Sequence, residues 1–234
     1  SAVLGEAERL AQWMKGQLVF YERRPVELRY GVLHEGRFKY RTYNDYGEGE
    51  ELLTETFGES SAWEVLCQNV CAFVEQGEAS LIFVRAKHEA RRGAELLAAR
   101  MDLPAAHAAI AALEDLEATR ARDSLLATLN SGVAFHNADL SPEERRVVEQ
   151  AFRTGEVMVM VSTSTLAVGL NMPAQNVFLS AEKWRYDQRL GIPWKTPILH
   201  TEYENMGGRA GRLGAGHAFG RSILIATSPF DEET

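Results

Sequence analysis

The sequence has no long apolar run and few cysteines. Its apolar stretches, such as Val157–Val161, are far shorter than the ~20 residues that span a bilayer. No basic segment followed by an apolar stretch opens the chain, so we expect no secretory signal. Cys67 and Cys71 are four residues apart on a predicted helix without a nearby histidine, which is a poor ligand set for zinc. We therefore predict a cytoplasmic protein with two free thiols, no bound metal and no membrane partner.

A self-sufficient phosphate-binding loop is also missing. Such a loop needs a lysine between a glycine and a serine or threonine, and none of the five lysines follows a glycine. The only Asp-Glu pair, Asp231-Glu232, lies in the C-terminal tail and not after a predicted strand. We therefore do not expect this chain to hold a magnesium nucleotide by itself.

Length and composition are those of a globular protein. The 234 residues suit one full domain with an appendage, at about 150 residues a domain. Hydrophobic residues at 45% and charged residues at 25% exclude disordered and fibrous classes. The net charge of −8 comes from seven acids between residues 44 and 64 and three at the C-terminal end. Without these ten acids the remainder would carry a charge of +2, so net charge does not decide whether nucleic acid is a partner.

Hydrophobic periodicity changes near residue 60. Before it we expect a helix over Glu6–Lys15, a β-rich run at Leu18–Tyr21, a hairpin of Val26–Leu33 and Phe38–Tyr43, and a solvated acidic loop over 44–60. After it we expect strands at Leu81–Val84, Val133–Phe135, Val157–Val161, Val177–Leu179 and Ser222–Ala226, separated by helices at 61–77, 89–129 (broken near Asp102–Pro104), 141–155 and 201–206. This pattern predicts an α/β fold with an open, mostly parallel sheet, helices on both faces, and an N-terminal helix and β-hairpin appendage.

Polar and cationic residues follow several of the predicted strands. Arg85 follows the strand at 81–84, His136 the strand at 133–135, and Ser162–Thr165 the strand at 157–161. Ligands of open parallel sheets bind at the carboxyl ends of the strands, so we expect these groups to share one edge. The glycine-rich run Gly207–Arg212 follows the last predicted helix, and we expect it at the same edge.

The run Gly207–Arg212 carries two arginines. Arg209 and Arg212 are three residues apart and point the same way in helical or turn geometry. Gly208 and Gly211 leave no side chain in front of either guanidinium. Such a pair can bind one phosphoryl group, so the sequence predicts a site for a phosphate-rich ligand.

At this point the sequence resembles the superfamily-two DExH helicases, most closely the Ski-like and archaeal repair-helicase branch. Val161–Pro173 (VSTSTLAVGLNMP) resembles motif V, and Asn205–Arg212 (NMGGRAGR) resembles motif VI, about 40 residues further on. Shorter likenesses extend the resemblance over nearly the whole chain: Leu81–Lys87 to motif IV, Gly132–Leu140 to motif IVa, Ser1–Val3 to motif III, and Arg24–Leu28 to the connection between the two motor domains.

The resemblance implies the second RecA-like domain of an ATP-dependent nucleic-acid helicase. Residues 1–24 would be the tail of the first motor domain, 25–60 a connecting β-hairpin and acidic loop, and 61–234 the second RecA-like domain. ATP with Mg²⁺ would be held mainly by the missing first domain, a partner of this one, so the isolated chain is expected to be inactive.

The resemblance also assigns roles to individual residues. Arg209 and Arg212 would face the γ-phosphate, with Arg212 as the first choice for the arginine finger, and Gly169, Asn171 and Asn205 would lie near the nucleotide. Contacts to the backbone of single-stranded DNA or RNA would come from Arg85, His136, Thr163 and Thr165.

Several positions depart from the family pattern. Asn205 stands where glutamine is usual, Val3 where threonine is usual, and Asn137 and Asp139 where histidine and glycine are usual. These departures leave open a degenerate helicase-like module that binds nucleic acid or protein without ATP turnover. An unrelated α/β nucleotide-binding enzyme is a third interpretation, which the missing phosphate loop disfavours.

Overall fold

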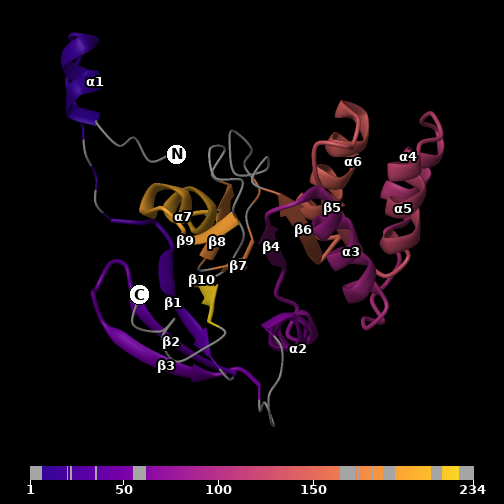
Figure 1. Ribbon diagram of the computed structural model, residues 1–234, viewed down its shortest axis with the longest axis horizontal. Coiled ribbons are helices and arrows are strands. Elements are labelled where there is room, and N and C mark those ends of the chain that lie inside the picture. The colour runs from indigo at the N-terminus through magenta and orange to yellow at the C-terminus, as the bar shows by residue number, and fades with distance from the viewer. Residues whose placement is uncertain are drawn as a thin grey trace.

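The computed structural model describes residues 7–19, 21, 23–34, 36–54, 62–163, 172, 174–180, 182–186, 193–211 and 218–226. Within these ranges the strands form one large sheet of eight strands and a separate pair (Figure 1). The large sheet has the order β3-β2-β1-β10-β7-β4-β6-β5. Its strands are β1 (Glu27–His34), β2 (Arg37–Thr42), β3 (Glu48–Leu52), β4 (Ser80–Val84), β5 (Val133–His136), β6 (Val159–Thr163), β7 (Asn176–Ser180) and β10 (Phe219–Ile225).

From β1 to β5 every neighbouring pair in this order is parallel, and β2 and β3 join antiparallel at the β1 edge. This confirms the predicted open, mostly parallel α/β sheet. The N-terminal hairpin pairs directly with β10, through the register Arg29 to Arg221. The sheet therefore runs continuously across residue 60, where the sequence pattern changes.

Two helices cover one face of the sheet. In α2 (Ala62–Glu75), Phe73 packs on Phe178 of β7 with ring centroids 6.0 Å apart. In α3 (Lys87–Ala98), Gly93 approaches β6 so closely that an added Cβ would lie 3.3 Å from Val161.

The opposite face carries α7 (His200–Gly207). A Cβ added at Gly207 would lie 2.2 Å from the Oγ of Ser222 and 3.6 Å from Leu179. Leu179 is the neighbour of Phe178 in β7, and successive strand residues point to opposite faces, so α7 lies across the sheet from α2. The prediction of helices on both faces is thus confirmed. The remaining helices are α1 (Ala7–Trp13), α4 (His107–Glu114), α5 (Arg120–Leu129) and α6 (Pro142–Arg153). α5 and α6 lie beside β5, and α4 packs against both of them (Figure 1).

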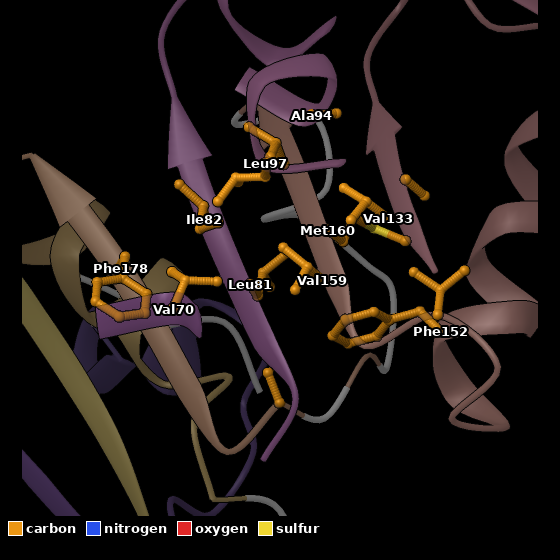
Figure 2. Packing of buried hydrophobic residues seen from close by; sticks show 14 of the residues in the cluster. Val70, Leu81, Ile82, Ala94, Leu97, Val133, Phe152, Val159, Met160 and Phe178 are labelled. Atoms are coloured by element: carbon orange, nitrogen blue, oxygen red, sulfur yellow. The ribbon is translucent and has the colours of Figure 1, made fainter. Parts of the chain in front are cut away.

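The core lies between these layers. β4, β5 and β6 contribute side chains from successive positions, including Leu81, Ile82 and Met160, all at most 1% exposed (Figure 2). Leu97 of α3 and Phe152 of α6 pack against them. A strand covered on both faces buries consecutive residues, which is why these strands read as continuous apolar runs in the sequence.

The start of α6 matches its prediction from the sequence. Ser141 accepts a hydrogen bond at its Oγ from the backbone N–H of Glu144 (3.1 Å). The Glu144 carboxylate accepts one in return from the N–H of Ser141 (2.6 Å). This reciprocal capping box satisfies two backbone donors that would otherwise have no partner in the first turn.

The acidic stretch was predicted wrongly as a loop, because Glu48–Leu52 forms β3. Its acids bind arginines of β2: Glu48 lies opposite Arg41 and binds it at 2.9 Å, and Glu50 binds the diagonal neighbour Arg37 at 2.7 Å. Cross-strand pairs of opposite charge stabilise an antiparallel strand that has little apolar surface.

Other differences concern segments without a strong pattern. Leu18, Val19 and Tyr21 form no strand and are exposed. The antiparallel pair β8 (Glu182–Tyr186) and β9 (Pro193–Pro197) was not predicted. The helical region predicted over 89–129 is broken twice. One break lies near 102–104, as expected, and the other lies between α4 and α5.

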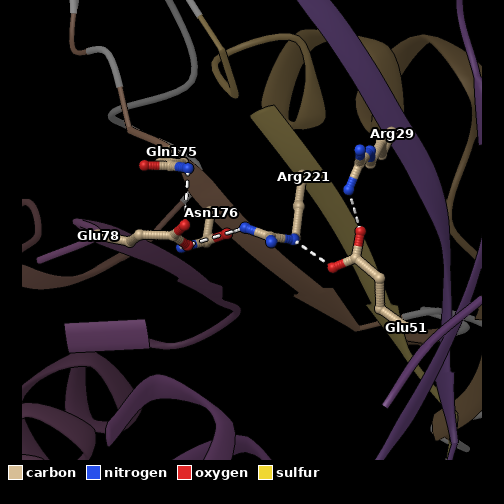
Figure 3. A network of polar contacts seen from close by, with 6 residues as sticks. All are labelled: Arg29, Glu51, Glu78, Gln175, Asn176 and Arg221. Carbon is tan, nitrogen blue, oxygen red and sulfur yellow. Dashed lines mark hydrogen bonds and ion pairs between the residues drawn. The ribbon is translucent and has the colours of Figure 1, made fainter. Parts of the chain in front are cut away.

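A polar network joins the N-terminal strands to the rest of the sheet (Figure 3). Arg221 of β10 donates to Glu51 of β3 (2.9 Å) and to Glu78 before β4 (2.8 Å). Glu51 also binds Arg29, and Glu78 accepts from Asn176 (3.0 Å). Arg221 is only 6% exposed, so these two carboxylates, and not water, compensate its positive charge.

Candidate functional site

The carboxyl ends of β4, β6 and β7 meet at one edge of the sheet, as predicted. Val84 pairs with Thr163, which is 5% exposed, and Arg85 follows as an exposed residue. Arg85 donates from Nη2 to the Oγ of Ser180 at the end of β7 (3.1 Å). Its guanidinium therefore lies over the edge, in solvent, with a hydroxyl beside it.

Two side chains that depart from the family pattern connect the ends of β4 and β5. Asn137 donates from Nδ2 to the backbone oxygen of Lys87 (3.0 Å) and accepts from the N–H of Asp139 (2.9 Å). Asp139 in turn binds the ammonium of Lys87 at 2.5 Å, with both side chains about half exposed. Lys87 lies just after a predicted strand end, within the segment that resembles motif IV, but no role in binding was predicted for it.

His136 lies at the end of β5 but is buried, with 2% of its surface exposed. Its Nε2 is 2.9 Å from Oε1 of Glu149 on α6. Burial lowers the pKa of His136 below its usual value, although the hydrogen bond and the charge of Glu149 oppose this shift. A neutral ring bonded to an internal carboxylate does not favour the direct phosphate contact predicted for His136.

The turn Gly207–Gly211 does not share this edge, which corrects the prediction from the sequence. Ala210 forms a parallel bridge with Ala174, two residues before β7 begins. A Cβ added at Gly211 would lie 2.6 Å from the backbone nitrogen of Gly220, at the start of β10. The physical reason is that α7 connects two parallel strands, so it runs back across the sheet and ends at their amino side.

Arg209 lies in this turn and is 2% exposed. Its backbone N–H donates to Met206 (3.2 Å), and its backbone oxygen accepts from the N–H of Ala174 (3.4 Å). Gly211 has a φ of +61°, a conformation that glycine adopts without strain. The turn is therefore fixed through its main chain against the segment that precedes β7.

Among the other predicted residues, Asn205 is half-buried on α7. Nearby on the same helix, burial raises the pKa of Tyr203 to about 12, so its phenol stays protonated at neutral pH. Four predicted residues lie outside the described ranges: Thr165, Gly169, Asn171 and Arg212.

Both cysteines are free, and burial raises the pKa of the Cys67 and Cys71 thiols. Within the described residues, no three His, Cys, Asp or Glu side chains gather in a way that could hold a metal ion. No helix in that part of the chain has the length and apolar character needed to cross a membrane.

Comparison with known proteins gives consistent matches. Residues 61–214 match the model of the helicase conserved C-terminal domain. The ATP-dependent DNA helicase Hel308 of Pyrococcus horikoshii is 33% identical over 232 residues, which cover 97% of this chain and 30% of that protein. The Hel308 of Pyrobaculum calidifontis is 36% identical over 245 residues, covering 100% of this chain and 32% of that protein. This chain therefore spans about a third of the length of the curated relatives it matches.

Proposed function

Since the chain belongs to the family of helicase conserved C-terminal domains, we propose that it is the second motor domain of an ATP-dependent DNA helicase related to Hel308. The observation that carries this proposal is the match over residues 61–214, which includes the carboxyl-edge residues and the turn with Arg209. Residues 1–24 belong to the first motor domain, which holds ATP and Mg²⁺. The cytoplasmic location stays a prediction.

On the nucleotide side, this chain supplies guanidinium groups to the terminal phosphate of ATP. Arg212 makes the direct contact, and Arg209, which packs inside the domain, supports it. Arg212 offsets negative charge on the phosphoryl group during transfer. Gly169, Asn171 and Asn205 line the nucleotide from the same side.

On the nucleic-acid side, Arg85, Thr163 and Thr165 bind backbone phosphates of a single DNA strand. The exposed guanidinium of Arg85 supports this role, because it lies at the sheet edge with a hydroxyl beside it. We assign His136 a different role from the predicted one: its bond to Glu149 holds the end of β5 against α6.

The two sites lie at opposite ends of the strands and are joined by one segment. Thr163 ends β6 at the carboxyl edge, and Ala174 bonds to Arg209 at the amino side. We propose that ATP-driven closure against the first domain is coupled to DNA binding, because Thr163 and Ala174 lie close together in the sequence.

The experiment that tests this function uses the protein with its first motor domain. We expect single-stranded DNA to stimulate its ATP turnover, and Arg85→Ala to weaken strand affinity about fivefold, with a salt dependence shallower by about 0.7 in log–log slope. Fluorescence anisotropy over a salt series measures both quantities. Arg37→Ala, at an exposed arginine of β2, is the matched control and should leave them unchanged. Turnover that ignores single strands would contradict the proposal.

The pair of Lys87 and Asp139 gives a second prediction. Asp139→Asn removes a negative charge from the carboxyl edge of the sheet and leaves the ammonium of Lys87 available to a DNA phosphate. We expect strand affinity to rise about two- to fivefold, because an exposed ion pair is weak and phosphate competes for the lysine. The same anisotropy measurement checks this, with Lys87→Ala expected to shift affinity in the opposite direction. If both variants bind single-stranded DNA as tightly as the unaltered protein does, the DNA does not contact the Lys87 and Asp139 pair.

A further inference from the structure

The side chain of Arg24 reaches from the segment before β1 to the turn that carries Arg209. Its Nη2 donates to the backbone oxygen of Ala210 (2.8 Å) and to that of Gly208 (3.3 Å). These carbonyls flank Arg209, whose own backbone oxygen accepts from the N–H of Ala174. Three consecutive carbonyls of the turn are thus each bonded by a group from another segment.

Arg24 is itself held in place. Its backbone N–H donates to Oδ1 of Asn44 (2.8 Å), and Nδ2 of Asn44 donates to the backbone oxygen of Arg24 (3.0 Å). The backbone N–H of Asn44 donates to Glu27 at the start of β1 (3.1 Å). The guanidinium also lies 5.8 Å from the centre of the Tyr43 ring. Asn44, in the turn after β2, therefore holds the main chain of Arg24 in place.

The placement of this cation is favourable for α7. Gly208 is the C-cap of the helix, where backbone oxygens lack helical partners and the helix dipole is negative. The guanidinium also lies close to Gly208, where an added Cβ would be in ordinary contact with Nη1 of Arg24 at 3.9 Å. A cation that bonds both sides of one residue restricts that residue's backbone more than a single capping bond does.

We propose that Arg24 is a positioning residue for ATP hydrolysis, which fixes the turn Gly207–Gly211 so that Arg212, the next residue of the chain, meets the nucleotide. The inference rests on the proposed function. Because Arg24 closes the segment assigned to the first motor domain, it ties the connection between the domains to the arginine-bearing turn. Arg24 touches neither nucleotide nor strand, and it acts through Gly208 and Ala210.

The test is steady-state ATP turnover by the full protein with saturating single-stranded DNA. Arg24→Met keeps the apolar stem and removes the donors; we expect kcat to fall about thirtyfold, with KM for ATP and strand affinity each changed less than threefold. Arg24→Lys retains the charge and should recover most of the loss. Asn44→Ala removes the side-chain hydrogen bonds that hold the backbone of Arg24, and it should lower kcat about threefold to tenfold.

Ser141→Ala is the control for a purely structural effect, because it removes the cap of α6, which lies beside β5 at the far edge of the sheet. It should lower the melting temperature without lowering kcat. A kcat of Arg24→Met within threefold of the unaltered protein overturns the inference, as does an equal loss in Ser141→Ala. If Arg24→Met does not fold, an unchanged kcat in Asn44→Ala overturns it. Absence of turnover in the unaltered protein instead overturns the proposed function.

Discussion

Arg212→Ala is expected to lower ATP turnover about a thousandfold in the protein that includes its first motor domain. An arginine that neutralises charge on a transferring phosphoryl group contributes about 10³–10⁵ in rate. The nucleotide is held mainly by the first domain, so KM for ATP should change by less than tenfold. Arg209→Ala should also lower kcat strongly, and its burial predicts a lower melting temperature as well. Single-turnover ATP hydrolysis separates the chemical step from binding.

Two further variants make the arginine test specific. Arg212→Lys keeps the positive charge but loses the planar pair of donors, so we expect only partial recovery. Arg146→Ala, at an exposed arginine of α6, should leave turnover unchanged. Should Arg212→Ala hydrolyse ATP within tenfold of the unaltered protein, the degenerate-module interpretation would replace the motor.

Arg221→Ala is expected to destabilise the fold by about 3 kcal/mol, because it leaves two largely buried carboxylates without their shared cation. Glu51 and Glu78 are 19% and 14% exposed at the side chain, so water compensates them poorly. Arg221 also contacts the rings of Phe73 and Phe219, at 4.8 and 4.7 Å from their centres. For a chain of this size the melting temperature should fall by roughly 6–12 °C, as measured by thermal denaturation.

The control variant for this network is Arg37→Ala. Arg37 of β2 forms an ion pair with Glu50 of β3, and both side chains are exposed. An exposed ion pair contributes little, so the melting temperature should move by less than about 3 °C. Similar losses for Arg37→Ala and Arg221→Ala would mean that burial of the network does not matter for stability.

The parts of the fold that followed from the sequence were those with one dominant local signal. β4, β5 and β6 are covered on both faces and therefore appear as apolar runs. The capping box at Ser141 located the start of α6. β3 could not be predicted in this way, because its acids are compensated by Arg37 and Arg41 on another strand. β8 and β9 likewise have no pattern that distinguishes them from a loop.

For the site, residue types were easier to predict than positions. Arg85 and Thr163 lie at the expected edge because parallel strands end together. The turn Gly207–Gly211 was misplaced because we assigned it to the carboxyl edge without following the direction of α7, which the order of elements already fixes. His136 was assigned to a nucleic-acid contact because no local signal in the sequence indicates its partner, Glu149, thirteen residues later. Arg24 was part of a recognised segment, but its contact with the turn depends on tertiary structure alone.

The close contact of Gly211 with Gly220 limits how this protein can change shape. A Cβ at Gly220 would lie only 2.1 Å from the nitrogen of Gly211, so the two main chains touch with nothing compressible between them. The hydrogen bond from the N–H of Gly211 to the backbone oxygen of Ala174 (3.0 Å) holds the turn on the sheet nearby. Movement of Arg209 relative to the sheet would break these contacts, so we expect the turn and the sheet to move as one body.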